Sequence, residues 1–446
     1  MQKYIFKNIS LVNEGKIKQC DILVSGSRIE KIDNQINSHS SYHEINGEGK
    51  HLLPGVIDDQ VHFRDPGLTH KATIFTESRA AVAGGVTSFM EMPNTIPNAL
   101  TIKILEDKYK IAEKDSIANY SFFMGVSNDN SDEVLKANNF KKDICGVKIF
   151  MGSSTGNMLV NNHSTLNRIF SESELLIATH CEDERIIKKN LEIALASGKE
   201  LTIFDHPIIR DEEACFESSL VAIQFANKYN SRLHILHIST EKELQLFGNM
   251  LPLKEKKITA EVCVHHLHFT SDDYKNYGYN IKCNPAIKEP KNKEALWQGL
   301  LSDKLDVIAT DHAPHLLSEK TPPYLHASSG LPLVQHPLLL MLQYYKEGKI
   351  SLENIARKMS HAVADCFLIK DRGYVREGYF ADLVVVDLNT EFKVSKENIY
   401  YKCGWSPFDS HTFPAKIEST FVNGNPVFTN GHFLNSSTGM RLKFNR

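Results

Sequence analysis

Eight short apolar or β-branched runs occupy the central part of the chain, and each leads into polar residues. Most are followed by a segment of helix length. Strands alternating with helices predict a parallel sheet, and eight such units predict a (β/α)8 barrel. Barrel enzymes place their chemistry at the carboxyl ends of the strands, so the polar residues there are candidate site residues. The runs are Leu52–Phe63, Gly85–Asn94, Tyr120–Ser127, Cys145–Gly152, Leu175–Glu182, Leu233–Thr240, Ile258–His266 and Leu305–His315.

The two ends of the chain differ from the middle, because they consist of short strands joined by tight turns. We predict that residues 1–53 and 371–446 pair into one small β-sandwich beside a barrel made of residues 54–370. Residues 318–329, directly after the eighth run, carry no regular pattern and are a candidate active-site loop. The predicted outer strands are Tyr4–Leu11, Asp21–Val24, Arg28–Ile32, Phe380–Asp387 and Ile417–Val422.

Composition and charge narrow the class of protein. The 446 residues are 41% hydrophobic and 24% charged, which is ordinary for a soluble globular enzyme. A formal net charge of −3 argues against nucleic acid or an acidic membrane surface as a partner. Eight cysteines without a C-x-x-C pair favour free thiols in a reducing compartment. With no signal-like start and no run near the roughly 20 apolar residues that span a bilayer, we expect a cytoplasmic protein without a membrane segment.

The first run ends in a polar cluster with three side chains on one face. Gln60, His62 and Arg64 are spaced two apart, and residues two apart on a strand share a face. At the end of a buried strand, this alignment predicts a combined metal and anion site. Taken alone, Arg64 could equally form a surface salt bridge with Asp65.

Two other runs carry charged residues that a buried strand rarely tolerates. Lys148 lies inside the fourth run, where burying an unpaired ammonium is costly. As a neutral amine it can take up CO₂ and become a carbamate that bridges two metals; otherwise it reaches the barrel rim with its charge in water. Asp311 follows the eighth run, where a carboxylate can bind a metal and exchange a proton, or cap the next helix.

Histidines occur at the ends of the fifth and sixth runs. His180 and His237 lie at the carboxyl ends, where barrel ligands are expected, whereas His234 lies deeper and is predicted to be structural. A single histidine in such a run is more often a hydrogen-bonded core residue than a ligand. The seventh run adds His265 and His266 and is followed by His268; we interpret all three as packing residues or as supports behind the ligands.

Together these strand ends resemble the binuclear site of the metal-dependent amidohydrolases, whose ligands come from strands one, four, five, six and eight. The first-strand signature of that family is His-x-His, and Gln60 stands in place of the first His. The continuation through Arg64 into Pro66-Gly67 narrows the resemblance to the dihydroorotases, and the two sandwich segments narrow it to their long-chain type. The ligands that the resemblance implies are His62, Lys148, His180, His237 and Asp311.

The resemblance implies Zn²⁺ as the cofactor, with one or two ions per chain. His180 and His237 would hold the more exposed ion, and His62 with Asp311 the more buried one. A carbamate formed on Lys148 from CO₂ would bridge both. A hydroxide on the metals would attack the ring amide, and Asp311 would shuttle the proton to the departing nitrogen.

Gln60 leaves three outcomes open for the buried ion. A neutral amide in place of an imidazole weakens one ligand without adding charge. The chain could hold a weaker second zinc through the Gln60 carbonyl, work with a single ion, or have lost activity.

The resemblance also implies a substrate. In dihydroorotases an Arg binds the ring carboxylate with help from an Asn and a His, matched here by Arg64, Asn94 and His315, while Asn284 would lie against the ring amide. We therefore predict a homodimeric dihydroorotase that interconverts N-carbamoyl-L-aspartate and L-dihydroorotate in de novo pyrimidine (UMP) biosynthesis. The alternatives are a hydantoinase- or allantoinase-like hydrolase of cyclic ureides, and a non-catalytic partner of a transcarbamoylase.

Overall fold

A nearly closed barrel of eight parallel strands forms the centre of the structure, a computed structural model that describes residues 2–152, 157–434 and 439–446. All eight predicted runs contribute a barrel strand, so the (β/α)8 prediction is confirmed. Ser153 and Ser154, the polar continuation of the fourth run, lie outside the described residues. The strands, which pair in chain order, are β6 (Val56–Val61), β7 (Val86–Glu91), β8 (Asn119–Gly125), β9 (Gly146–Phe150), β10 (Ile177–His180), β11 (Leu233–Ile235), β12 (Ile258–Cys263) and β13 (Val307–Ala309).

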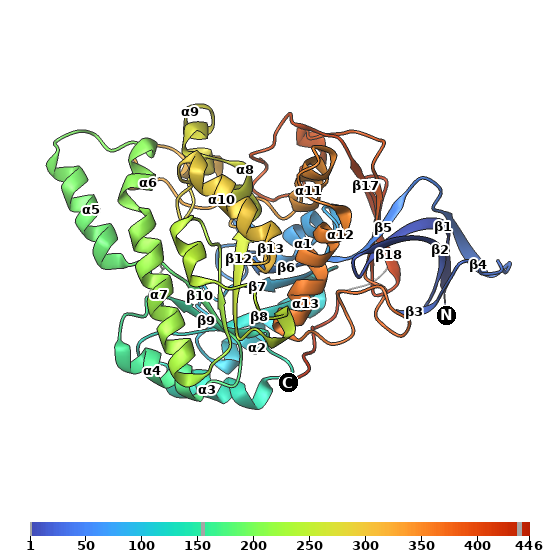
Figure 1. Ribbon diagram of the computed structural model, residues 1–446, viewed down its shortest axis with the longest axis horizontal. Coiled ribbons are helices and arrows are strands. Elements are labelled where there is room, and N and C mark those ends of the chain that lie inside the picture. The colour runs from blue at the N-terminus through green and yellow to red at the C-terminus, as the bar shows by residue number, and fades with distance from the viewer. Residues whose placement is uncertain (1, 153–156, 435–438) are drawn as a thin grey trace.

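Helices cover the outside of the barrel (Figure 1). In α2, Leu105, Tyr109 and Ala112 recur at helical spacing and are buried, so an apolar stripe fixes which face the helix turns inward. The helices are α1 (Ile74–Ala83), α2 (Ile102–Asp115), α3 (Ser131–Leu135), α4 (His163–Glu172), α5 (Glu184–Ala196), α6 (His206–Ile209), α7 (Glu212–Tyr229), α8 (Val264–His268), α9 (Tyr274–Tyr277), α10 (Pro290–Leu301), α11 (Pro337–Lys346), α12 (Leu352–Ala356) and α13 (Ala362–Phe367).

The two ends of the chain share one nine-stranded sheet beside the barrel, on the right in Figure 1. Its strands are β1 (Lys3–Asn13), β2 (Lys16–Ser25), β3 (Arg28–Asp33), β4 (Tyr42–Asn46), β5 (His51–Pro54), β14 (Leu383–Asp387), β17 (Lys416–Val422), β18 (Asn425–Thr429) and β19 (His432–Phe433), and a separate small hairpin is made of β15 (Phe392–Lys393) and β16 (Thr412–Phe413). β5 joins the two ends, because it pairs with β1 on one side and β14 on the other.

The sheet curls on itself and encloses its own apolar core. β1 and β17 are separated by two strands, which in a flat sheet would put them about 14 Å apart. The rings of Phe6 and Phe421 nevertheless lie 5.1 Å apart between centroids. This gives the small β domain from both chain ends that the sequence predicts, while its boundaries at residues 53 and 371 stay predictions. Beyond it the chain returns to the barrel, where Leu442 and Phe444 are buried beside Phe123.

The barrel is closed by contacts between its first and last strands. The backbone N–H of His62 donates to the carbonyl of His312 over 2.7 Å. The Asp58 carboxylate accepts from Thr310 twice, from the hydroxyl over 2.6 Å and from the backbone N–H over 3.2 Å. These bonds align the carboxyl ends of β6 and β13, where the predicted site residues lie.

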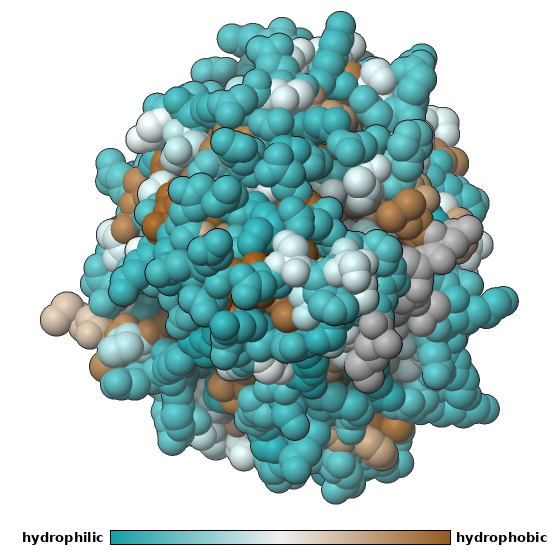
Figure 2. Space-filling model, turned by 90° about the vertical axis from the view of Figure 1, so that its right-hand side faces the viewer, coloured by the Kyte–Doolittle hydropathy of each residue, from teal (hydrophilic) through white to brown (hydrophobic). Residues whose placement is uncertain are grey.

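The face that carries the outer sheet is mostly hydrophilic, with hydrophobic residues scattered over it (Figure 2). Scattered apolar side chains are normal on a folded surface. Across the described residues, no helix is both long and apolar enough to cross a membrane.

Gly55 is the point where the chain passes from the outer sheet into the barrel. The sequence pattern reads Leu52–Phe63 as one run, but β5 ends at Pro54 and β6 begins at Val56. A Cβ on Gly55 would lie 2.1 Å from the Thr87 hydroxyl oxygen and 2.4 Å from the Thr87 methyl carbon. Only a glycine fits this close approach without displacing the Thr87 side chain.

We expect Gly55→Ala to destabilise the protein by about 1–3 kcal/mol, because overpacking forces a backbone or rotamer shift. The urea midpoint of unfolding measures it. Gly248→Ala is the matched control, since nothing lies within 4 Å of the added carbon there. Thr87→Ala in the Gly55→Ala background should restore part of the loss, because it removes the two closest atoms but leaves the Cβ of residue 87 at 2.8 Å. A midpoint of Gly55→Ala equal to that of the control would contradict the steric explanation.

Candidate active site

A cavity of about 540 Å³ opens at the carboxyl ends of the barrel strands. All of the site residues singled out in the sequence line this one cavity, although they come from widely separated parts of the chain. They are Gln60, His62, Arg64, Asn94, Lys148, His180, His237, Asn284, Asp311 and His315. Ser328 and Ser329, from the segment expected to form an active-site loop, also line it.

On one side of the cavity, His62 lies between Asn94 and Asp311. Its Nδ1 is 2.7 Å from the Asn94 side-chain oxygen, and its Nε2 is 3.1 Å from Asp311 Oδ1. Burial lowers the pKa of His62, so a neutral ring donates through Nδ1 and turns the lone pair of Nε2 toward the carboxylate. Gln60 donates to the same Asp311 oxygen over 3.0 Å. Two acceptors that face each other fit a shared cation between them.

His180 and His237 face each other on the opposite side. His180 Nδ1 lies 2.9 Å from His237 Nε2, and His180 Nε2 donates to Glu182 over 2.9 Å. Burial lowers the pKa of both rings, so both are neutral. A metal-bound histidine typically donates one ring N–H to an oxygen and turns its other ring nitrogen toward the metal and the remaining ligands. His180 has this arrangement, since its Nε2 faces Glu182 and its Nδ1 faces His237. The donor set therefore fits a divalent metal.

Lys148 lies in the buried floor of the cavity. It is 1% exposed, so its charge does not reach the barrel rim in water. Burial lowers its pKa to about 7, against the opposing influence of Asp311 and Glu261. A large share of Lys148 is therefore the neutral amine near neutral pH, the form that reacts with CO₂.

Arg64 forms a fixed cation in the wall of the cavity. It is buried, its Nε donates to the Pro314 carbonyl over 3.2 Å, and its Nη2 lies 3.1 Å from His315 Nε2. Burial lowers the pKa of Arg64 to about 10, which still leaves it charged at neutral pH. Asp65 instead accepts the backbone N–H of Ile74 at the start of α1, so the surface ion pair is not formed.

His315 and Asn284 line the cavity with unequal hydrogen bonding. The other nitrogen of His315 lies 3.1 Å from Lys71 Nζ, and burial with the nearby cations holds the pKa of His315 well below its ordinary value. The buried side-chain oxygen of Asn284 has no hydrogen-bond partner within the described part of the chain. A buried acceptor without a partner is available to a ligand.

Three of these residues have left-handed backbone conformations, with φ of 65° at Arg64, 40° at His237 and 48° at Asp311. Such angles are uncommon outside glycine and cost of order 1–3 kcal/mol each. Strain of this kind persists where the surrounding structure imposes it, and it concentrates at functional sites.

Two residues of the site were missed from the sequence. Glu182 accepts from both His180 and Arg210, the latter over 2.5 Å, and Arg210 also lines the cavity. Burial opposes ionisation of Glu182, but Arg210 and His180 hold its pKa below the ordinary value. Glu182 lies two residues after His180, so the spacing rule applied to the first strand could have found it. Arg210 follows α6 and is joined to the site only by the fold.

Comparison with known proteins identifies the family. Residues 51–427 match the model of the amidohydrolase family. The chain belongs to the amidohydrolase family. This amidohydrolase is 30% identical over 448 residues to an allantoinase of Desulfitobacterium hafniense (strain DSM 10664 / DCB-2), covering 98% of each chain. It is 33% identical over 423 residues to a dihydroorotase of Carboxydothermus hydrogenoformans, covering 94% of this chain and 95% of the relative.

The solved structures similar to this amidohydrolase include the L-hydantoinase (dihydropyrimidinase) of Arthrobacter aurescens. The two share 25% sequence identity and superimpose with a TM-score of 0.93, covering 99% of this chain and 100% of that chain. The names of the relatives thus agree on the family and differ in substrate.

We expect Lys148→Met to raise the melting temperature of the chelator-treated amidohydrolase at about pH 6. The pKa of Lys148 falls from 10.5 in the unfolded chain to about 7 in the folded protein. Below about pH 7 the buried amine is charged, and its destabilisation of the folded state is at its maximum. Between these values the unfolded chain binds more protons, and wild-type stability rises by roughly 1.4 kcal/mol per pH unit. The advantage of the variant should therefore shrink toward about pH 10.

Lys108→Met is the matched control for this buried lysine. Lys108 and Glu91 form a fully buried ion pair with 2.7 Å between Nζ and Oε2, and breaking such a pair costs about 3–5 kcal/mol. If Lys148→Met destabilised the protein as much as Lys108→Met at low pH, Lys148 would be paired rather than stranded.

Proposed function

We propose that this amidohydrolase is a dihydroorotase, which opens L-dihydroorotate to N-carbamoyl-L-aspartate and closes it in the reverse direction in pyrimidine synthesis. The observation that carries the proposal is the buried guanidinium of Arg64 in the cavity wall. A ring carboxylate distinguishes dihydroorotate from uncharged cyclic ureides, and a fixed planar guanidinium suits a carboxylate.

His62, Lys148, His180, His237 and Asp311 would hold one or two zinc ions, with Lys148 as a carbamate. When bound, zinc lowers the pKa of a water and polarises the scissile carbonyl. The support comes from the set of potential ligands: neutral imidazoles that line the cavity, a carboxylate, and an amine whose pKa of about 7 allows reaction with CO₂.

Asp311 and Asn284 would act on the reacting amide of the substrate. Asp311 accepts a hydrogen bond from Gln60, and its pKa is lowered because the influence of nearby His62 outweighs that of burial. It is therefore ionised and ready to take a proton from the attacking water and return it to the departing ring nitrogen. The unpartnered oxygen of Asn284 would accept from the ring amide N–H. Arg64 and His315, with Asn94 beside them, would hold the carboxylate so that the ring presents its amide to Asp311.

The second candidate is an allantoinase-like ureide hydrolase, favoured by the 30% identity to the allantoinase over 98% of the chain. A third is a non-catalytic partner of a transcarbamoylase. Assays of L-dihydroorotate, allantoin and hydantoin on one zinc-reconstituted sample test all three. Preferred turnover of dihydroorotate supports the proposal, and preferred turnover of an uncharged ureide replaces it. If the protein turns over none of the three substrates and also binds no stoichiometric zinc, the non-catalytic protein is favoured. We further propose a cytoplasmic homodimer.

We expect Arg64→Met to lower kcat/KM for dihydroorotate by about 30- to 1,000-fold, since a charged hydrogen-bonded contact is worth roughly 2–4 kcal/mol. Bound zinc, measured by mass spectrometry on the same sample, should stay unchanged. Arg168→Met is the control, because Arg168 pairs with Asp132 on the surface of α4. Loss of zinc in Arg64→Met would show that Arg64 supports the metal site and not the substrate.

We expect Gln60→His to increase the zinc retained per chain at low free zinc. An imidazole lone pair is a stronger zinc ligand than an amide oxygen, and Gln60 directs its amide nitrogen at Asp311. Zinc retention after dialysis against a metal buffer measures the effect, with Gln224→His on the exposed face of α7 as a control for adding a histidine. Equal retention in both variants would mean that residue 60 does not limit the buried ion.

A further inference from the structure

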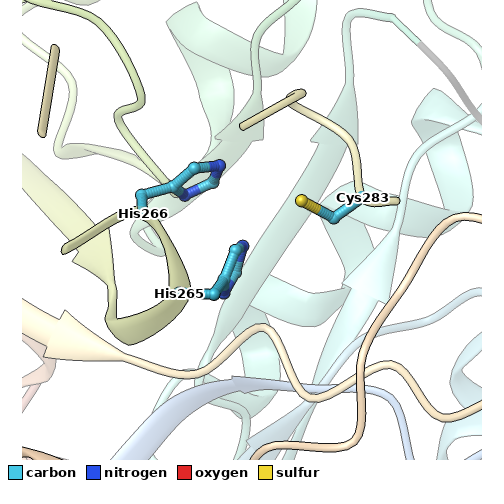
Figure 3. A group of neighbouring side chains, drawn as sticks. All are labelled: His265, His266 and Cys283. Atoms are coloured by element: carbon cyan, nitrogen blue, oxygen red, sulfur yellow. The ribbon is translucent and has the colours of Figure 1, made fainter. Parts of the chain in front are cut away.

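A second group of potential ligands consists of other residues than those assigned above, although it lies close enough to Asp311 and His237 to influence their pKa values. His265 and His266 come from α8, and Cys283 precedes the cavity residue Asn284. Their exposed fractions are 1%, 3% and 1%. Figure 3 shows the Cys283 thiol directed toward the two imidazole rings. One ligand atom from each residue lies within 4.8 Å of the other two.

The hydrogen bonding of the two rings leaves lone pairs available. His266 Nε2 donates to the Pro285 carbonyl over 3.1 Å, which fixes the tautomer and leaves Nδ1 as a bare acceptor. His266 Nδ1 has no hydrogen-bond partner among the described residues. The His265 ring contacts the Thr310 backbone, which opposes the lowering of its pKa, but neither of its nitrogens makes a hydrogen bond of good geometry within the described chain. Buried polar atoms in folded proteins nearly always have a well-formed partner, so these nitrogens are available to a ligand.

The protonation states suit a metal. Burial lowers the pKa of His265 to about 4 and that of His266 well below its ordinary value, so both rings are neutral ligands. Burial also raises the pKa of Cys283 to about 12. The thiol is therefore inert alone, and a bound cation would displace its proton.

A second buried group, Asp59, His234 and Glu261, differs in this respect. His234 Nε2 lies 3.1 Å from Asp59 and 3.7 Å from Glu261. Although burial opposes protonation, the two carboxylates raise the pKa of His234 to about 9. A protonated imidazole has no lone pair to offer at that nitrogen, so this group is an ion-pair cluster.

We propose that His265, His266 and Cys283 form an additional divalent metal site of zinc type, separate from the ligands of the proposed reaction. Two imidazoles and a thiolate are ligands that zinc accepts, and the Pro285 carbonyl behind His266 is the kind of contact that orients a metal-bound histidine. A metal here would anchor Cys283 and, through the backbone, its neighbour Asn284 in the cavity. The site does not depend on which ureide the protein hydrolyses.

Cobalt substitution tests the site, because a thiolate ligand gives Co²⁺ an intense near-ultraviolet charge-transfer band and nitrogen or oxygen ligands do not. The reduced, chelator-stripped protein is titrated with CoCl₂. The band should appear in the wild type and in His180→Asn, which removes a ligand of the proposed reaction site. It should be absent in Cys283→Ser. The absence of the band from the wild type would overturn the proposal.

Cys181 and Cys263 supply the matched controls. Cys181 is adjacent to His180, and the Cys263 thiol lies 3.9 Å from the Gln60 side-chain oxygen. The band should survive Cys181→Ser and Cys263→Ser. A band that survives Cys283→Ser, or that disappears with either control variant, would place the thiolate elsewhere and overturn the assignment.

His265→Gln keeps the thiol and decides the matter if Cys283→Ser fails to fold. Circular dichroism and melting of the metal-free variants establish folding. Loss of one imidazole should raise the cobalt concentration needed for half of the band by at least about tenfold. An unchanged titration would remove His265 from the site and overturn the three-ligand assignment.

Discussion

The join between the first and last barrel strands is the contact on which the site depends. The N–H of His62 donates to the carbonyl of His312, and the Asp58 carboxylate holds Thr310. Because this join fixes β6 against β13, Gln60 and His62 come within hydrogen-bond distance of Asp311. Asp311 directly follows Thr310 and has a left-handed φ, so the extended backbone is interrupted where the carboxylate enters the cavity. The contacts that close the barrel therefore also bring this side of the site together.

Burial sets the chemistry of the cavity once it is assembled. Removing imidazoles from water favours their neutral form, and an oxygen acceptor then selects the tautomer: Asn94 for His62 and Glu182 for His180. Glu182 can stay ionised at full burial because Arg210 pairs with it. The same desolvation disfavours the charged form of Lys148 and leaves a neutral amine that can react with CO₂. The surrounding sheet and helices hold these residues in place. The left-handed backbone conformations therefore occur at residues of the site itself: Arg64, His237 and Asp311.

The sequence predicts the barrel well, because a buried parallel strand reads as a continuous apolar run and each of the eight runs is one. The same property hides the passage at Gly55: an apolar run looks alike in the outer sheet and in the barrel. The sequence identifies strand-end residues such as His180 and Asp311, because the carboxyl end of each barrel strand lies on the face that carries the active site. Arg210 could not be found this way, since it enters the cavity from the loop after α6. The sequence predicts His265 and His266 as packing residues or supports behind the ligands and does not single out Cys283, because only the fold brings that thiol to α8.

Gln60 changes the polarity of one contact and leaves the shape of the site intact. Its amide nitrogen donates to Asp311, where the family pattern has an imidazole with a lone pair to offer. To present its oxygen instead, Gln60 must rotate and give up a hydrogen bond to a carboxylate, worth about 1.5–3 kcal/mol. A metal bound through that oxygen must recover this energy first. His180 and His237 face each other on the other side of the cavity and would give up only the neutral hydrogen bond between their rings, worth about 0.5–1.5 kcal/mol. The substitution therefore acts on one of two groups of ligands. It weakens metal binding by His62 and Asp311, at the ends of β6 and β13, and leaves His180 and His237, at the ends of β10 and β11, unchanged.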